Sequence, residues 1–122
     1  MTRDEFNAFC RSLPATSHVV QWGEADVWKV GGKVFAIGGW TDGETLGVTF
    51  KTSEISFEIL GNLPGLRPAP YLASRAMKWI QHYDRPGLGD DDLRHYLAES
   101  HAIVASGLTR KKRRELGLAE DR

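Results

Sequence analysis

The apolar side chains near the start of the chain are spaced as on one face of a helix. They recur at positions i, i+3, i+4 and i+7, at Phe6, Phe9, Cys10 and Leu13. Thr2 and Glu5 have the spacing of a capping box, and Pro14 cannot continue a helix. We therefore predict a helix from about Thr2 to Leu13, with Cys10 as a buried structural thiol.

The pattern then changes to short runs rich in β-branched and aromatic residues, at 18–22, 25–30, 33–37 and 45–50. Gly31-Gly32 separates two of these runs, and a Gly pair can take the positive φ angles of a tight hairpin turn. The region is predicted to form an antiparallel meander whose hairpin turns are candidate wings for entering a nucleic-acid groove.

Helical and extended patterns alternate in the second half. Ser53 is expected to cap a short helix to about Leu60. Residues 62–70 hold three prolines and a glycine, so no regular structure is expected there. A strand at 77–83, a loop and a long helix at 90–106 follow, and Thr109 can cap a last short helix that ends near 116–117.

These elements predict the α+β class, with an antiparallel β-sheet meander packed against helices. A chain of 122 residues is the usual size of one domain, which we place at 1–117, with 118–122 as a frayed tail. The sequence has no apolar stretch of membrane-spanning length and no signal-peptide pattern. A cytoplasmic location, with no membrane partner, is therefore the default expectation.

The charges are balanced overall but unevenly distributed. The chain has 16 Lys and Arg and 16 Asp and Glu, but residues 107–122 carry 6 basic and 3 acidic residues. Residues 110–114 are five consecutive cations, which suit either a solvated terminal helix or contacts to nucleic-acid phosphates. With other cations along the chain, the candidate phosphate contacts are Lys33, Lys51, Arg67, Arg75, Lys78, Arg110, Lys111, Lys112, Arg113 and Arg114.

No combination of residues suggests an enzyme active site. The four histidines include no i, i+4 pair, and the single cysteine permits neither an intrachain disulfide nor a Cys-based zinc site. There is no Gly-x-Ser-x-Gly nucleophile elbow, and the Gly pairs lack the strand–turn–helix setting of a phosphate loop. We expect no enzyme activity, no cofactor and no metal.

Three of the four tryptophans have an expected position. Trp28 and Trp79 lie inside predicted strands and are expected in the core. Trp40 lies beside a Gly-rich turn, so it is the tryptophan most expected at the surface and the candidate for stacking on a base.

Short motifs occur in a distinctive order: Gln21-Trp22-Gly23, Trp28-Lys29-Val30, Gly32 to Ala36, Val48 to Lys51, Ala69 to Leu72, Lys78-Trp79-Ile80, Ser100-His101, and Leu108 with Lys111 and Lys112. In their order over about residues 2–117 they resemble the MmcQ/YjbR family of small bacterial proteins. The resemblance implies a CyaY-like (frataxin-like) arrangement and DNA binding through a double wing. His101 departs from it, since the family usually has Tyr there, although His101 is expected to fit a helical surface position.

The leading hypothesis is a small cytoplasmic DNA-binding or DNA-associated protein that contacts phosphates through its basic residues. The alternative is a protein-interaction or small-ligand-binding module without nucleic acid, with an apolar patch or pocket near Trp22, Trp40 and Tyr71. Iron binding of the frataxin kind is disfavoured, because it needs a dense acidic ridge on the first helix, which offers only Asp4 and Glu5.

Overall fold

A computed structural model of the chain describes residues 1–40, 45–70 and 78–118. Helices and strands follow one another in the order α1 (Arg3–Ser12), β1 (Thr16–Gln21), β2 (Ala25–Val30), β3 (Lys33–Gly38), β4 (Val48–Lys51), α2 (Glu54–Leu60), β5 (Leu66–Pro68), β6 (Trp79–His82), α3 (Asp90–Ser106) and α4 (Arg110–Glu115). The tail predicted at 118–122 lies outside the described residues except for Leu118, whose N–H donates to the Arg113 carbonyl.

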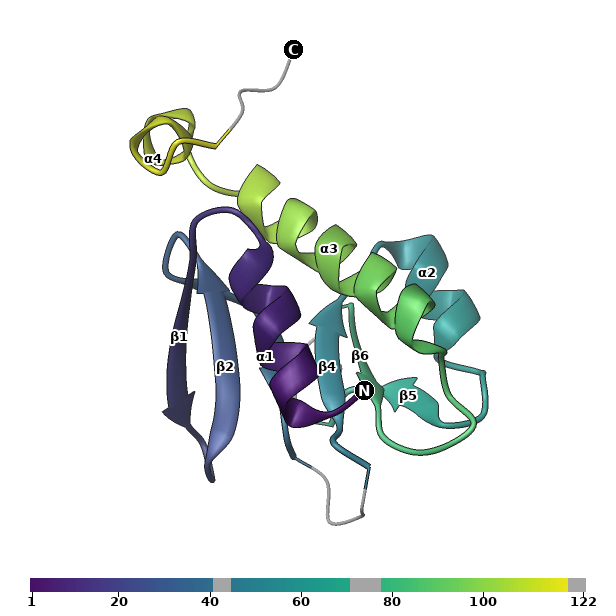
Figure 1. The fold of residues 1–122 in the computed structure, drawn as a ribbon. Helices are drawn as coiled ribbons and strands as arrows, with labels where there is room; N and C mark the ends of the chain where they lie inside the picture. Colours follow the sequence, from purple (N-terminus) through teal and green to yellow (C-terminus); the bar gives the residue numbers. More distant parts are fainter. Residues whose placement is uncertain (41–44, 71–77, 119–122) are drawn as a thin grey trace.

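The strands form an antiparallel sheet in the order β1-β2-β3-β4-β6-β5. Helices α1 and α3 lie across one face of it, and α2 packs beside β5 and β6 (Figure 1). This confirms the predicted α+β class and the meander of β1 to β4, and it is compatible with the CyaY-like arrangement. Within the described residues, no helix is both long enough and apolar enough to cross a membrane.

The expectation of no regular structure at 62–70 is wrong. Residues 66–68 form β5, in which Leu66 and Pro68 lie opposite His82 and Ile80 of β6. Proline is tolerated here because β5 is an edge strand, where a missing N–H removes no hydrogen bond from the sheet. Pro68 therefore belongs to a short edge strand and not to an irregular loop.

The N-terminal helix forms as its sequence predicts. Thr2 Oγ1 accepts a hydrogen bond from the Glu5 N–H at 3.1 Å, and the Glu5 carboxylate accepts one from the Thr2 N–H at 2.8 Å. Phe6 and Cys10 are fully buried against the sheet. Burial raises the pKa of the Cys10 thiol far above its usual range, which keeps the thiol protonated in its core position.

The core lies between the sheet and the helices α1 and α3. Ser100 and His101 connect α3 to the strands and to the turn after α1. Ser100 Oγ donates to the Phe35 carbonyl at 2.6 Å and accepts from the Lys51 N–H at 2.9 Å. His101 is 7% exposed, packs edge-on against the Phe35 ring at 5.2 Å, and places Nε2 2.7 Å from the Pro14 carbonyl oxygen. The surface position expected for His101 is therefore wrong, because its ring fills an aromatic position in the core.

Candidate nucleic-acid interface

The basic run forms α4, a short helix at the C-terminal end of α3. Thr109 caps it as predicted, accepting from the Lys112 N–H at 3.1 Å. Between the two helices, Leu108 is 7% exposed and packs on the β2–β3 turn, where a Cβ added to Gly31 would lie 2.6 Å from a Leu108 methyl carbon. This contact fixes the base of α4 at one end of the sheet, and the helix extends beyond it (Figure 1).

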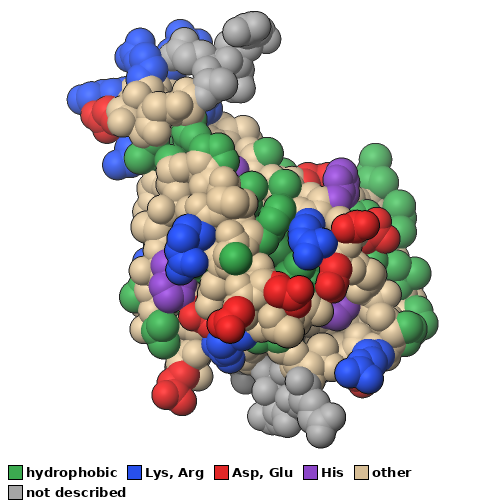
Figure 2. Space-filling view, in the orientation of Figure 1, with side chains coloured by type: hydrophobic (Ala, Val, Ile, Leu, Met, Phe, Trp, Pro, Cys, Tyr) green, Lys and Arg blue, Asp and Glu red, His purple; other side chains and the backbone are tan. Residues whose placement is uncertain are grey.

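Four of the five cations of α4 face outward. The exposed residues are Arg110, Lys111, Lys112 and Arg114. Arg113 is half-buried, and its Nη1 donates to the carbonyls of Ser106 and Leu108, each at 3.0 Å. Figure 2 shows Lys and Arg side chains gathered on α4, whereas positive and negative side chains are mixed on the body below it. The arrangement is a small basic projection anchored by Arg113.

Three other predicted cations lie at the end of the sheet towards which α3 runs: Lys33 on β3, Lys51 on β4 and Lys78 directly before β6. Lys33 begins β3 directly after the Gly31-Gly32 turn. Lys51 ends β4, opposite Trp79, and Lys78 precedes β6, so these two lie at that same end. Neighbouring strands are about 4.8 Å apart, which places the three backbones within a narrow strip. Lys78 Nζ, however, lies 4.9 Å from the Phe57 ring centroid.

Arg67 does not join this group. It lies opposite Gln81, on the sheet face away from α1 and α3, and its Nε donates to Gln81 Oε1 at 2.9 Å. Its guanidinium also stacks over the Tyr83 ring at 4.3 Å. These contacts indicate a role in covering the second sheet face. Arg75 lies outside the described residues.

The two hairpin turns described in full lie at opposite ends of the sheet. The Gly31-Gly32 turn forms as predicted, with φ angles of 60° and 81°, and lies next to α4. The β1–β2 turn, at residues 22–24, lies at the other end because β2 runs between the two turns. Only the Gly31-Gly32 turn is therefore placed to act together with the cations of α4.

The surface tryptophan is Trp22, not Trp40 as expected. Trp22 is 51% exposed in the β1–β2 turn. Trp40 is half-buried, because its Nε1 donates to the Trp22 carbonyl at 3.0 Å and its ring packs beside the buried Val27 and Ile37 cluster. Trp28 and Trp79 are buried, as predicted.

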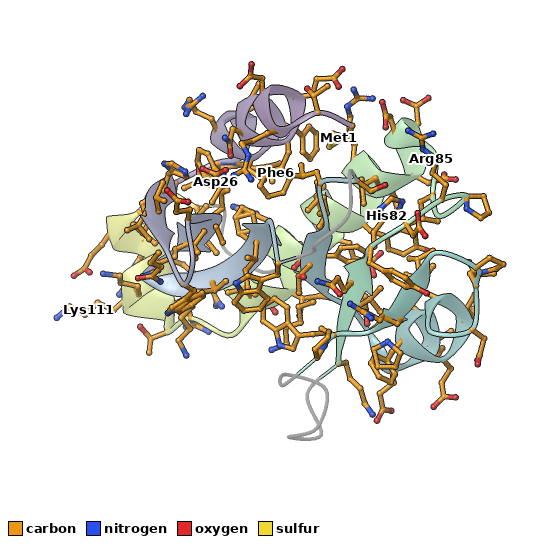
Figure 3. All side chains as sticks on the ribbon, turned by 90° about the horizontal axis from the view of Figure 1, so that it is seen from below. Met1, Phe6, Asp26, His82, Arg85 and Lys111 are labelled. Carbon is orange, nitrogen blue, oxygen red and sulfur yellow. The ribbon has the colours of Figure 1, made fainter. Side chains whose placement is uncertain are left out.

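A cavity of about 610 Å³ lies where the start of α1 meets the loop before α3, and sequence reasoning missed it. Its lining includes Arg3, Leu46, His82 and Arg85, so it is not the pocket expected beside Trp22 and Trp40; Tyr71 lies outside the described residues. Figure 3 shows Met1, His82 and Arg85 on the side of the molecule away from Lys111.

His82 beside this cavity is 9% exposed, and burial lowers the pKa of its imidazole. Its Nε2 has no hydrogen-bond partner among the residues that the structure describes, and a Cβ added to Gly87 would lie 2.2 Å from it. No spacing in the sequence signals this contact, because it forms between a strand and a loop. Among the described residues, no three His, Cys, Asp or Glu side chains gather in a group that could hold a metal ion.

The sequence matches the family model described as YjbR over residues 11–103. The fold is similar to the crystal structure of a Deinococcus radiodurans protein with the domain DUF419, at a TM-score of 0.82 and 23% identity, covering 99% of this chain and 91% of that one. A Pseudomonas syringae protein is similar at a TM-score of 0.68 and 17% identity, over 85% of this chain and 99% of that one. At these identities the likeness concerns the fold. None of the curated proteins matches the chain.

Proposed function

The chain belongs to the YjbR family, and from that premise we propose that it is a small DNA-binding or DNA-associated protein that contacts phosphates through the α4 end of its sheet. The observation that carries this proposal is the basic projection formed by α4. Its exposed cations stand on a short helix with one acidic residue, Glu115, so the local charge is strongly positive although the chain is neutral overall.

The physical basis of the proposal is release of counterions from DNA. Each phosphate neutralised by Lys or Arg frees condensed cations, and this gain does not depend on base sequence. Arg110, Lys111 and Lys112 are the proposed principal contacts, and Lys33 extends the positive surface past the Gly31-Gly32 turn. Arg113 is proposed to support α4, since its guanidinium is already bonded to the protein. The proposal is therefore one of binding and not of catalysis.

The test is fluorescence anisotropy of a labelled mixed-sequence DNA duplex titrated with protein at several salt concentrations. A variant with Arg110, Lys111 and Lys112 changed to Ala is compared with a control in which Arg11, Arg85 and Arg94 are changed to Ala. Both variants lose three positive charges, but the control residues lie on α1, the 84–89 loop and α3.

The proposal expects binding that weakens steeply with salt, is largely lost in the α4 variant, and is kept in the control. Equal losses in both variants would attribute binding to overall charge and not to α4. No binding by the unmodified protein even at low salt would remove the proposal.

A second candidate function, a protein-interaction module without nucleic acid, is favoured by large apolar side chains at the surface. They are Val19, Val20, Trp22, Ile55, Ile59 and Leu63. Isolated apolar residues are ordinary on a surface, but these gather in two places, along β1 with its turn and along α2 with the residues after it. Absence of DNA binding together with self-association in sedimentation experiments would favour this function.

A further inference from the structure

Strand β1 forms an open edge of the sheet. Its six residues pair with β2, and within the described residues no other strand lies beside it (Figure 1). Residues 17–20 are all exposed. One edge of β1 therefore presents alternate backbone N–H and C=O groups that have no partner strand, which is a template for pairing with another chain.

The two edges of the sheet differ in how they are protected. At the far edge, β5 has three residues and contains Pro68, and both features discourage pairing. Strand β1 has twice that length and contains no Pro, Lys, Arg, Asp or Glu. Val19 and Val20 on this strand are 36% and 55% exposed. The edge thus lacks the usual devices that keep a monomeric sheet from pairing.

We propose that β1 pairs antiparallel with β1 of a second copy of this chain, across a two-fold axis at Val19. Such an interface is isologous, so each chain offers the same strand and no other surface has to be complementary to it. The two sheets then continue into one another, and the unpaired N–H and C=O groups of both edges are satisfied together.

The alternation of side chains fixes where the axis can lie. Residues directly opposite each other in a sheet share a face, so the two-fold axis, which lies midway between the two strands, must be level with a residue and its own copy and not with the peptide bond between two residues. With the axis at Val19, the two copies of Val19 meet, Val20 lies opposite the partner's His18, and Gln21 lies opposite the partner's Ser17. An axis at His18 would instead bring two imidazoles together and leave Gln21 beyond the paired region.

A second copy suits this edge electrostatically as well. The strand contains no Lys, Arg, Asp or Glu that would repel its own copy, and His18 Nε2 lies 2.8 Å from a carboxylate oxygen of Asp26 within its own chain. The chain as a whole has a formal net charge of zero, so there is no long-range repulsion to overcome. The exposed apolar side chains of Val19 and Val20 become covered by the pairing.

The chain offers a matched control on its other apolar surface. Ile55 on α2 is 75% exposed, and α2 packs beside β5 and β6, at the opposite side of the sheet from β1. A lysine at Ile55 therefore changes charge and apolar exposure as a lysine at Val19 does, without touching the proposed interface.

Sedimentation equilibrium over a range of concentrations tests the pairing, with circular dichroism to verify that each variant is folded. The unmodified chain is expected to rise towards twice the mass of one chain as concentration increases. Val19→Lys, which would place two ammonium groups opposite each other, should keep the mass of one chain, and Ile55→Lys should associate like the unmodified protein. An unmodified chain that stays at the mass of one chain at all concentrations would overturn the proposal, and so would association lost only in Ile55→Lys.

Disulfide cross-linking tests the register. Opposite residues of antiparallel strands have Cα atoms about 4.5–5.5 Å apart, within the range that a disulfide spans. Val19→Cys is expected to form a covalent dimer under mild oxidation, and Gln21→Cys only when mixed with Ser17→Cys, while the fully buried Cys10 stays unreacted. Cross-linking of Ile55→Cys in place of Val19→Cys would contradict the arrangement. These measurements contain no DNA, so their outcome is independent of the DNA-binding proposal.

Discussion

The guanidinium Nη1 of Arg113 lies 3.0 Å from the carbonyl oxygen of Leu108. The same nitrogen donates to the Ser106 carbonyl at the end of α3, whose last carbonyls have no partner within their own helix. One side chain of the basic run thus closes the junction between α3 and α4. The run therefore divides into a supporting residue and outward-facing cations.

Replacing Arg113 by Ala is expected to lower the free energy of unfolding by about 1 kcal/mol, because two backbone carbonyls lose a charged donor at a partly exposed site. Lys111→Ala, which removes the same charge from an exposed position of α4, should change it by less than about 0.5 kcal/mol. Urea denaturation of both variants measures the difference. Equal free energies of unfolding for the two variants would show that the hydrogen bonds of Arg113 make no net contribution to stability.

Gly31 and Gly32 form one turn but differ in what surrounds them. Both have positive φ, yet a Cβ at Gly31 would lie 2.6 Å from a Leu108 methyl carbon, whereas a Cβ at Gly32 has nothing within 4 Å. Each Gly→Ala change should cost about 1–2 kcal/mol from backbone strain, and Gly31→Ala should cost more because it also displaces Leu108. Thermal unfolding of the two variants tests which of them is less stable. A lower midpoint for Gly32→Ala than for Gly31→Ala would contradict the prediction.

Local signals predicted much of the fold. The capping box of α1, the Gly31-Gly32 turn and the Thr109 cap act over three or four residues, and each forms as predicted. Strand β5 could not be predicted in this way, because its pairing with β6 joins residues more than ten positions apart and its Pro content resembles a loop. The core position of His101 likewise depends on Phe35 and Pro14, distant in sequence.

The candidate site was predicted only as a set of charges. Sequence could identify the run at 110–114, but it could not separate Arg113 from its neighbours, since the carbonyls that hold it belong to α3 and the loop after it. Arg67 was included for its charge, whereas its partners, Gln81 and Tyr83, come from a strand and loop some fifteen residues later. Tertiary contacts therefore decide which cations face solvent.

Ser100 gives a prediction about the contact between α3 and the sheet. Its buried hydroxyl bonds the Phe35 carbonyl and the Lys51 N–H, so Ser100→Ala leaves two backbone groups without that partner and should cost about 1–3 kcal/mol. Ser106 on the same helix is exposed, and its hydroxyl donates to the Ile103 carbonyl at 2.7 Å. Ser106→Ala is therefore a matched control, expected to cost less than about 0.5 kcal/mol. Comparable losses in chemical denaturation would refute the bridging role.

Asp26 joins α1 to the first two strands through a buried carboxylate. It is 5% exposed and accepts hydrogen bonds from Arg3 and from His18 Nε2. Burial alone would raise the pKa of this carboxyl, but the bonds from His18 and Arg3 outweigh it and hold the pKa below its ordinary value of 3.8. The folded state therefore binds the proton less readily than the unfolded chain does.

A carboxyl whose pKa is lowered by folding contributes stability above its unfolded pKa, and that stability is lost as the pH falls through the folded pKa. Asp26→Asn removes the titrating group and its charged hydrogen bonds, so the variant should be less stable than the unmodified protein at pH 7. The difference between their thermal midpoints should shrink as the pH is lowered from about 4 towards 2, because the carboxyl of the unmodified protein is then protonated as well. Midpoints measured at intervals across this range test the linkage, and a difference that stays constant down to the lowest pH would show that ionisation of Asp26 does not stabilise the fold.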